Sequence, residues 1–362
     1  MLKKYLSLPF LLLFVTAGTS GLTCFSPGMM PGIDLGSSFL TATPITLDAD
    51  GKAVFTSLIT GNKVDVADLG PMSPGDRIIL TVKPTVGSPL DPVAALFDDN
   101  QELFALNDDV DFVQGRIDSA IDEIVTVATP RMFLAITKFP LGNQEGAYEA
   151  SVQVMRGQPI PVPVPQKLLL NFAGGSVSIP SEGNITVDPF DAKDINPIYD
   201  GQTNQIKNVI VNTVRNRFAG MGIQIVTSDD IPPPNPQDCL SVILFGGFSQ
   251  TKFGVAQSVD QGNRDRCDDG IVFTNDFTKP FALPLPSADG VGQAIGNVAA
   301  HEAGHLLGLN HVADITDLMD TTGTASSLLA EQIFKTSRLA ASVFPIGMQN
   351  GPALLHRVIP PP

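Results

Sequence analysis

One eleven-residue segment near the carboxyl terminus constrains this 362-residue chain more than any other: residues 301–311, HEAGHLLGLNH. Histidines four positions apart lie one turn apart on one face of a helix, so His301 and His305 can reach the same ion. Gly308 can end that helix in a left-handed conformation and return His311 as a third ligand. The chain has four histidines, three of them here, and a chance match at the five fixed positions is about a one-in-a-million event.

Three protein ligands leave a fourth position open for water or substrate, which is the mark of a catalytic zinc site. Glu302 follows the first histidine, which places its carboxylate beside the metal and not on it. The sequence therefore predicts that His301, His305 and His311 bind Zn²⁺, and that Glu302 activates the metal-bound water as a general base.

The segment resembles the signature of the metzincin zinc metallopeptidases, in which H-E-x-x-H-x-x-G-x-x-H precedes a methionine turn. Residues 317–320, Asp-Leu-Met-Asp, match that turn in the manner of matrixin-like catalytic domains. The resemblance implies that Met319 supports the site from beneath the metal. It also implies an α+β catalytic domain, with a mixed sheet and three main helices, that acts as a metalloendopeptidase.

Two departures from the metzincin pattern stand out. Some metzincins carry a tyrosine just after the turn methionine, but the only tyrosines here are Tyr5, Tyr148 and Tyr199. The cysteine-switch motif of matrixins is also absent, because Cys24 lacks the flanking residues that such a switch needs.

Local patterns place this catalytic domain at residues 166–362. Apolar spacing predicts helices over 202–218, from near Gly290 into the histidines, and over 326–343. Short apolar runs predict strands, and we expect the one at 271–274 or the one at 254–258 to form an edge that receives an extended peptide.

Residues 46–155 show short, alternating strand patterns separated by turn signals, which predict an all-β sandwich. They resemble the bacterial pre-peptidase C-terminal domain through residues 74–77, 90–98, 107–109, 118–119 and 146–148, although here the domain precedes the peptidase. Asp108, Asp109 and Asp111, together with Asp98, either gather around Ca²⁺ or form a solvated turn.

The remaining segments are a signal peptide (1–23), a flexible leader (24–45) and a proline-rich linker (156–165). Lys3 and Lys4 precede a short apolar core, as in secretory signals. Proline alternates with apolar residues in the linker, which is typical of a stiff spacer. Cys24 would be a lipid anchor if the signal is a lipoprotein signal, but the residues before it fit a lipobox poorly.

We expect Cys239 and Cys267 to form a disulfide in an oxidising compartment. The formal net charge of −15 excludes nucleic acid and anionic membranes as partners, and fits either solubility outside the cell or Ca²⁺ binding. No segment after the signal is long enough to span a membrane. We therefore expect a monomer that is secreted or held in the cell envelope.

The sequence accordingly predicts an exported zinc endopeptidase that hydrolyses a protein or peptide substrate. The alternative is a non-catalytic surface or adhesion protein in which the sandwich binds a partner and the peptidase fold is vestigial. The intact Glu302 beside three histidines favours the enzyme.

Overall fold

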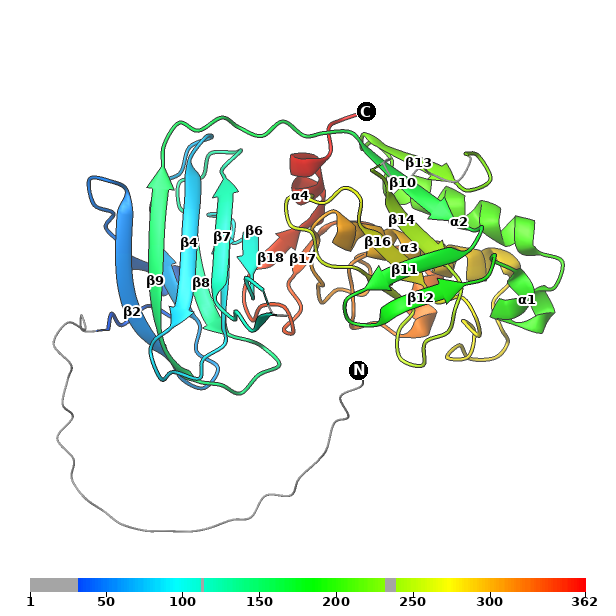
Figure 1. Ribbon diagram of the computed structural model, residues 1–362, viewed down its shortest axis with the longest axis horizontal. Helices are drawn as coiled ribbons and strands as arrows, with labels where there is room; N and C mark the ends of the chain where they lie inside the picture. Colours follow the sequence, from blue (N-terminus) through cyan, green and yellow to red (C-terminus); the bar gives the residue numbers. More distant parts are fainter. Residues whose placement is uncertain (1–31, 112–113, 232–238) are drawn as a thin grey trace, which may run out of the picture. The chain divides into compact units, whose positions relative to one another are not determined.

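The computed structural model describes residues 32–111, 114–231 and 239–362. The predicted signal peptide and Cys24 lie outside these residues. Residues Gly32–Pro362 form one compact unit, in which a β-sandwich (residues 32–155) is followed by an α+β region (residues 166–362) (Figure 1). Residues 156–165 connect the two without helix or strand.

The sandwich consists of a five-stranded sheet, in the order β1-β3-β8-β5-β6, and a four-stranded sheet, in the order β2-β9-β4-β7. Apolar side chains of both sheets alternate inward to form one core, as period-two patterns require. The strands are β1 (Thr43–Pro44), β2 (Lys52–Ile59), β3 (Asp65–Asp68), β4 (Arg77–Pro84), β5 (Pro92–Phe97), β6 (Leu103–Asn107), β7 (Ser119–Ile124), β8 (Phe133–Lys138) and β9 (Gly146–Met155).

A second core covers the outer face of the five-stranded sheet. All six residues of β5 are buried, because Phe39 from the amino-terminal side and Leu339 and Phe344 from the α+β region pack on that face. The prediction of a flexible leader over 24–45 is thus wrong for its second half. Leu35 and Phe39 are buried, and β1 pairs with β3, so apolar burial holds this part of the chain on the sandwich.

The α+β region is built on a five-stranded sheet in the order β13-β10-β14-β16-β15, with only β15 antiparallel to its neighbour. Helices α2 and α3 pack on one face, and the hairpin β11–β12 covers the other. The elements are β10 (Gln166–Asn171), β11 (Gly175–Ile179), β12 (Gly183–Val187), α1 (Ala192–Ile195), α2 (Thr203–Arg217), β13 (Ile223–Thr227), β14 (Ser241–Phe245), β15 (Gly254–Ala256), β16 (Asp269–Val272), α3 (Ala288–Leu306), β17 (Thr336–Arg338), β18 (Met348–Asn350) and α4 (Gly351–Val358).

Two of the predicted helices are present as α2 and α3, but the helix predicted over 326–343 is wrong. That stretch contains one short 3₁₀ helix (Ala325–Leu329) and strand β17, which pairs with β18. The side chains of Gln293 and Asn297 on α3 donate hydrogen bonds to the carbonyls of Leu329, Leu328 and Ala330. These carbonyls therefore accept side-chain hydrogen bonds in place of the backbone hydrogen bonds that a continuous helix would need.

Two further predictions concern covalent structure and membrane insertion. Cys239 and Cys267 are joined by a disulfide, as predicted from the sequence. Across the described part of the chain, none of the helices combines the length and the apolar character that a membrane span requires.

Candidate metal centre

Helix α3 carries the first two histidines, and its two ends explain where it lies. Ser287 caps the helix by accepting a hydrogen bond from the amide of Gly290 at 3.2 Å, the usual role of a serine at this position. Gly308 follows the last turn with φ of +91°. A Cβ there would lie 2.8 Å from the carbonyl oxygen of Asp260, so both the conformation and the space at this turn require glycine.

The turn after Gly308 brings the third histidine against the first two. The Nε2 atom of His305 lies 3.1 Å from Nε2 of His301 and 3.0 Å from Nε2 of His311. Two nitrogens on one tetrahedral zinc, each about 2.0–2.1 Å from it, are roughly 3.3 Å apart. The three side chains together could hold a metal ion.

Backbone carbonyls fix the orientation of two of these rings. His301 donates from Nδ1 to the carbonyl oxygen of Leu318, and His305 donates from Nδ1 to that of Leu309, both at 2.7 Å. A carbonyl only accepts, so the hydrogen must be on Nδ1 and the lone pair on Nε2 faces the other histidines. Metal-binding histidines are held in this way in many proteins, and lone pairs facing each other fit a cation between them.

The protonation of the rings also suits metal binding, which needs neutral imidazole. Burial lowers the pKa of His301, and it lowers the pKa of His305 well below its ordinary value, with the other two histidines acting in the same direction. Burial likewise lowers the pKa of His311 to about 4. At neutral pH all three rings are therefore uncharged and able to donate to a metal.

Glu302 is buried beside the histidines, with 5% of its surface exposed. Burial raises its pKa to about 8, although the amide of Ala256 and the charge of Lys252 act in the opposite direction. Gly254 on β15 leaves the space that the carboxylate occupies, because a Cβ at that position would lie 2.5 Å from Oε1 of Glu302. The carboxylate is thus held between α3 and the edge strand of the sheet.

Met319 is buried under α3. A Cβ at Gly304, between the two helical histidines, would lie 2.6 Å from the Met319 sulfur, so the thioether packs directly against the turn of the helix that carries them. The Met319 amide donates to Asp317, and its carbonyl accepts from Val312. These bonds close the segment that follows the third histidine on itself, and the hydrogen bond from His301 to the carbonyl of Leu318 holds it against the helix.

The histidines and Glu302 line a cleft of about 620 Å³. One wall is strand β15, which stands at the end of the strand order and pairs only with β16 within the described sheet. The opposite wall is formed by residues 318–332, including Leu318, Asp320 and Leu328. An extended chain could therefore lie between an unpaired strand edge and this loop.

Several contributors to the centre have no signature in the sequence. The carbonyls of Leu309 and Leu318 orient the rings, and any residue type could supply them. Gly254 could have been found only by knowing that β15 faces Glu302. Neither described tyrosine lines the cleft: Tyr148 donates to Asp65 in the sandwich, and Tyr199 donates to the carbonyl of Pro286.

The acidic group proposed for calcium is composed differently in the structure. Asp108 and Asp109 gather with Asp91, with one carboxylate oxygen from each within 4.8 Å of the others. Asp98 instead accepts the amides of Asn100 and Glu102 within its own turn, and Asp111 accepts the amide of Gln114. Local turn bonding therefore separates two of the four predicted residues from the cluster.

Comparison with known proteins gives partial similarities only. No protein-family profile matches the chain, and no curated protein does. Among solved structures, the archaemetzincin of Methanopyrus kandleri matches 48% of this chain and 91% of its own, at 12% identity and a TM-score of 0.28. A zinc-dependent peptidase of Methanocorpusculum labreanum matches 46% and 93%, at 14% identity and a TM-score of 0.27. The pre-peptidase C-terminal domain of a Bacillus anthracis collagenase matches 31% and 93%, at 19% identity and a TM-score of 0.22. Matches at this identity and TM-score assign no function to this chain.

Proposed function

We propose that this protein is an exported zinc-dependent endopeptidase of the metzincin type. One observation carries the proposal: three neutral imidazoles present their Nε2 atoms to one point, with a buried glutamate next to them. The Nε2 atom of His305 lies 3.1 Å from that of His301 and 3.0 Å from that of His311. In this proposal residues 166–362 are the peptidase, residues 46–155 a pre-peptidase-type sandwich, and residues 156–165 the linker.

Zinc, when bound, supplies Lewis acidity that polarises a substrate carbonyl and makes water acidic near neutral pH. His301, His305 and His311 would hold it, with Met319 packed beneath. Glu302 would take the proton of the attacking water and pass it to the leaving amine, acting first as base and then as acid. Its buried position beside the three histidines places the carboxylate where a group that exchanges this proton would have to lie.

The edge strand β15 would align the substrate. An extended polypeptide can add to an unpaired strand edge through main-chain hydrogen bonds, and Gly254–Ala256 is such an edge beside Glu302. This mode of binding needs a polypeptide on both sides of the cleaved bond, which supports an endopeptidase over other zinc hydrolases.

An oxidising location supports the same proposal. The Cys239–Cys267 disulfide is typical of proteins outside the reducing cytosol, in agreement with the signal predicted over residues 1–23. Secretion or retention in the cell envelope, with or without a lipid on Cys24, would expose the enzyme to protein substrates there.

The test is to measure zinc content and peptide hydrolysis on the same purified full-length preparations. We expect one zinc per chain and hydrolysis of casein that 1,10-phenanthroline abolishes. Glu302→Ala should lower hydrolysis by a factor of about a hundred or more while zinc remains bound, because Glu302 is not a ligand. His311→Ala should lose both zinc and activity.

His356, the fourth histidine, lies exposed on α4, so His356→Ala is the matched control and should change neither measurement. Full zinc content without any hydrolysis would favour the alternative of a non-catalytic binding protein. Activity that survives Glu302→Ala would rule out the assigned base.

A further inference from the structure

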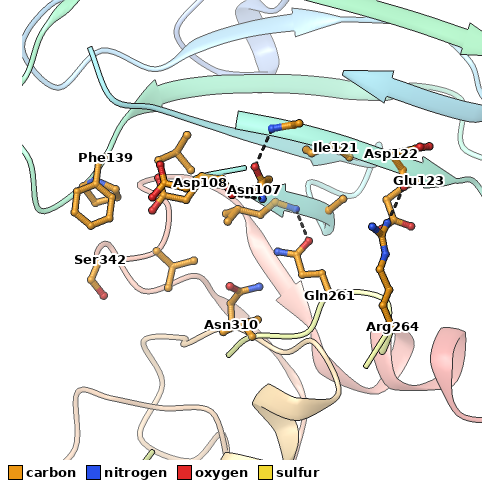
Figure 2. Close-up of a pocket in the computed structure, with 18 residues that line it drawn as sticks. Asn107, Asp108, Ile121, Asp122, Glu123, Phe139, Gln261, Arg264, Asn310 and Ser342 are labelled. Carbon is orange, nitrogen blue, oxygen red and sulfur yellow. Dashed lines mark hydrogen bonds and ion pairs between the residues drawn. The ribbon is translucent and has the colours of Figure 1, made fainter. Parts of the chain in front are cut away.

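A second cavity, of about 470 Å³, lies between the sandwich and the α+β region (Figure 2). We call it the interdomain pocket. Strands β6 and β7 form its sandwich side, and residues 259–264, Asn310 and residues 342–343 form the other. Its volume lies in the range of sites that bind small molecules and far exceeds the space of one metal ion.

One wall of the interdomain pocket carries negative charge without a counter-ion. Asp108 and Asp109 line it, and their carboxylates gather with that of Asp91. In each of the three, the Oδ1 atom is buried and has no hydrogen-bond partner among the described residues. Burial, together with the carboxylates of Asp109 and Asp91, raises the pKa of Asp108 to about 7. Desolvated carboxylates of this kind favour a positively charged neighbour.

The other acidic residues of the interdomain pocket are already neutralised. Asp122 pairs with Arg77 at 2.5 Å, and Glu123 pairs with Arg264 at 2.7 Å. The three aspartates have no such ion pair with any described residue. The unmatched charge is therefore confined to one end of the pocket.

The opposite wall presents a buried hydrogen-bond donor that is also unmatched. Asn310 has 6% of its surface exposed, and its backbone amide and carbonyl are both bonded to the side chain of Gln349, at 2.8 and 2.7 Å. Its Nδ2 atom has no partner in the described structure, and Figure 2 shows the side chain pointing into the pocket. A buried donor that stays unpaired destabilises the protein, and a ligand that accepts its hydrogen bond would remove this cost.

A bound polypeptide with a basic side chain would pair with the unpaired groups on both walls of the pocket. Its ammonium or guanidinium group would meet the aspartates, and the apolar stem of a lysine or arginine would lie along Val93, Ile121 and Val343. A main-chain peptide group offers both an acceptor and a donor, so it would satisfy the Asn310 amide in either orientation. A metal ion alone would leave Asn310 unpaired and most of the volume unused.

The interdomain pocket lies next to the cleft that the three histidines and Glu302 line. The chain that leaves β15 lines the cleft at Ser258 and Val259, and then lines the pocket at Val259, Gln261 and Arg264. Asn310 in the pocket directly precedes His311 in the cleft. A substrate aligned on β15 would therefore continue toward the pocket.

We propose that the interdomain pocket is a substrate subsite that receives a lysine or arginine side chain remote from the cleaved bond. This subsite proposal rests on the proposed endopeptidase activity. It makes the sandwich a part of the substrate-binding surface.

The experiment uses quenched fluorescent peptides with one cleavable core and a single lysine moved stepwise along either flank. We expect one lysine position to raise kcat/KM about tenfold over the lysine-free peptide, the size of one charge-assisted hydrogen bond, mainly through a lower KM. In the double variant Asp108→Asn/Asp109→Asn, the kcat/KM for the lysine peptide divided by that for the lysine-free peptide should fall to about one. Asp50→Asn, an exposed aspartate of the same sandwich, is the matched control and should keep the wild-type ratio.

A binding measurement separates this subsite proposal from the peptidase proposal. The Glu302→Ala chain, titrated with the best lysine peptide and followed by fluorescence anisotropy, should bind it about tenfold more tightly than the lysine-free peptide. Asn310→Ala should weaken that binding without loss of zinc, as a second variant should the aspartate pair fail to fold. If no peptide is cleaved but the lysine preference in binding remains, only the enzyme assignment fails. Equal binding of both peptides, or Ca²⁺ binding in calorimetry that depends on Asp108 and Asp109 without any lysine preference, would overturn the subsite.

Discussion

Gly254 leaves the space that the side chain of Glu302 occupies. An added Cβ would meet Oε1, Cγ and Cδ of Glu302 at 2.5–2.9 Å, and those atoms belong to a side chain that can swing away. Under the proposed mechanism, Gly254→Ala should preserve the fold and the zinc content but displace the carboxylate of Glu302, so that kcat/KM falls about a hundredfold. Hydrolysis of a fluorescent peptide and zinc analysis on the same sample check this.

Gly351→Ala is the control for this substitution. Gly351 begins α4, and a Cβ there would have its nearest neighbour at 3.4 Å, an ordinary contact. Should both variants keep wild-type activity, the carboxylate of Glu302 is not confined by β15 as described.

Asp268 predicts a pH dependence of stability. It is 1% exposed and accepts a hydrogen bond from Ser241 at 2.6 Å. Burial raises its pKa to about 7, with Asp260 and Asp265 adding to the effect and the Ser241 bond opposing it. A folded-state pKa above the ordinary value means that the stabilising contribution is complete below about pH 4 and is lost as the pH rises through 7.

Asp268→Asn keeps an acceptor for Ser241 but does not titrate. We therefore expect the stability of this variant to increase relative to that of the wild type as the pH rises. The difference in free energy of unfolding should shift in favour of the variant by roughly 2–3 kcal/mol between pH 5 and pH 8. Urea unfolding of both proteins at four pH values measures it. Parallel pH profiles would show that Asp268 is ionised in the folded protein.

At the scale of elements, α2 and α3 approach so closely that glycine is needed where they meet. A Cβ at Gly296 would lie 2.6 Å from Cβ of Thr213. Alanine gains about 1 kcal/mol over glycine in a helix, but overpacking of a core costs typically 1–3 kcal/mol. Because the obstruction is the Cβ of a β-branched residue, and not a flexible end, we expect the cost to exceed the gain.

Gly296→Ala should accordingly lower the free energy of unfolding by about 1–2 kcal/mol, measured by urea titration at constant zinc. Gly290→Ala in the first turn of the same helix is the comparison, since its nearest contact would be at 3.3 Å. A stabilised Gly296→Ala protein would mean that the helices can separate at little cost.

The elements also show how far the sequence could predict the structure. The periodic segments at α2 and α3 and the alternating strands of the sandwich could be found, because each pattern reflects the face that its element buries. The segment at 326–343 could not, because its carbonyls are bonded by Gln293 and Asn297 of α3, and such tertiary bonds leave no local pattern.

The candidate sites likewise include residues whose proximity the sequence predicts and residues whose proximity it does not. Three histidines and one glutamate at this spacing come close together on a helix and the turn that follows it, so the sequence predicts that they form one site. The interdomain pocket is lined by both Asp108 and Asn310, which are 202 residues apart in the sequence. Nothing in either neighbourhood indicates the other, since the packing of the sandwich on the α+β region creates the site.

At the scale of the whole molecule, one aromatic residue couples the sandwich to the α+β region. Phe344 is fully buried, and its ring centre lies 5.6 Å from that of Phe97 on β5. We predict that Phe344→Ala costs about 3–5 kcal/mol, and that sandwich and α+β region of the wild type unfold in one calorimetric transition.

Phe248→Ala serves as the control, because this ring is 52% exposed and should change stability by less than about 0.5 kcal/mol. Two resolved transitions in the wild type would show that the regions unfold independently despite their shared core.

The segment that carries Phe344 also contacts the candidate metal centre. Leu339 packs in the core shared with the sandwich, and the next residue, Ala340, donates its amide to the carbonyl of His311 at 3.0 Å. Thermodynamic linkage makes such a connection reciprocal. A cation bound by the three imidazoles would therefore stabilise the sandwich against unfolding, and a ligand that stabilises the sandwich would raise the affinity for that cation by the same free energy.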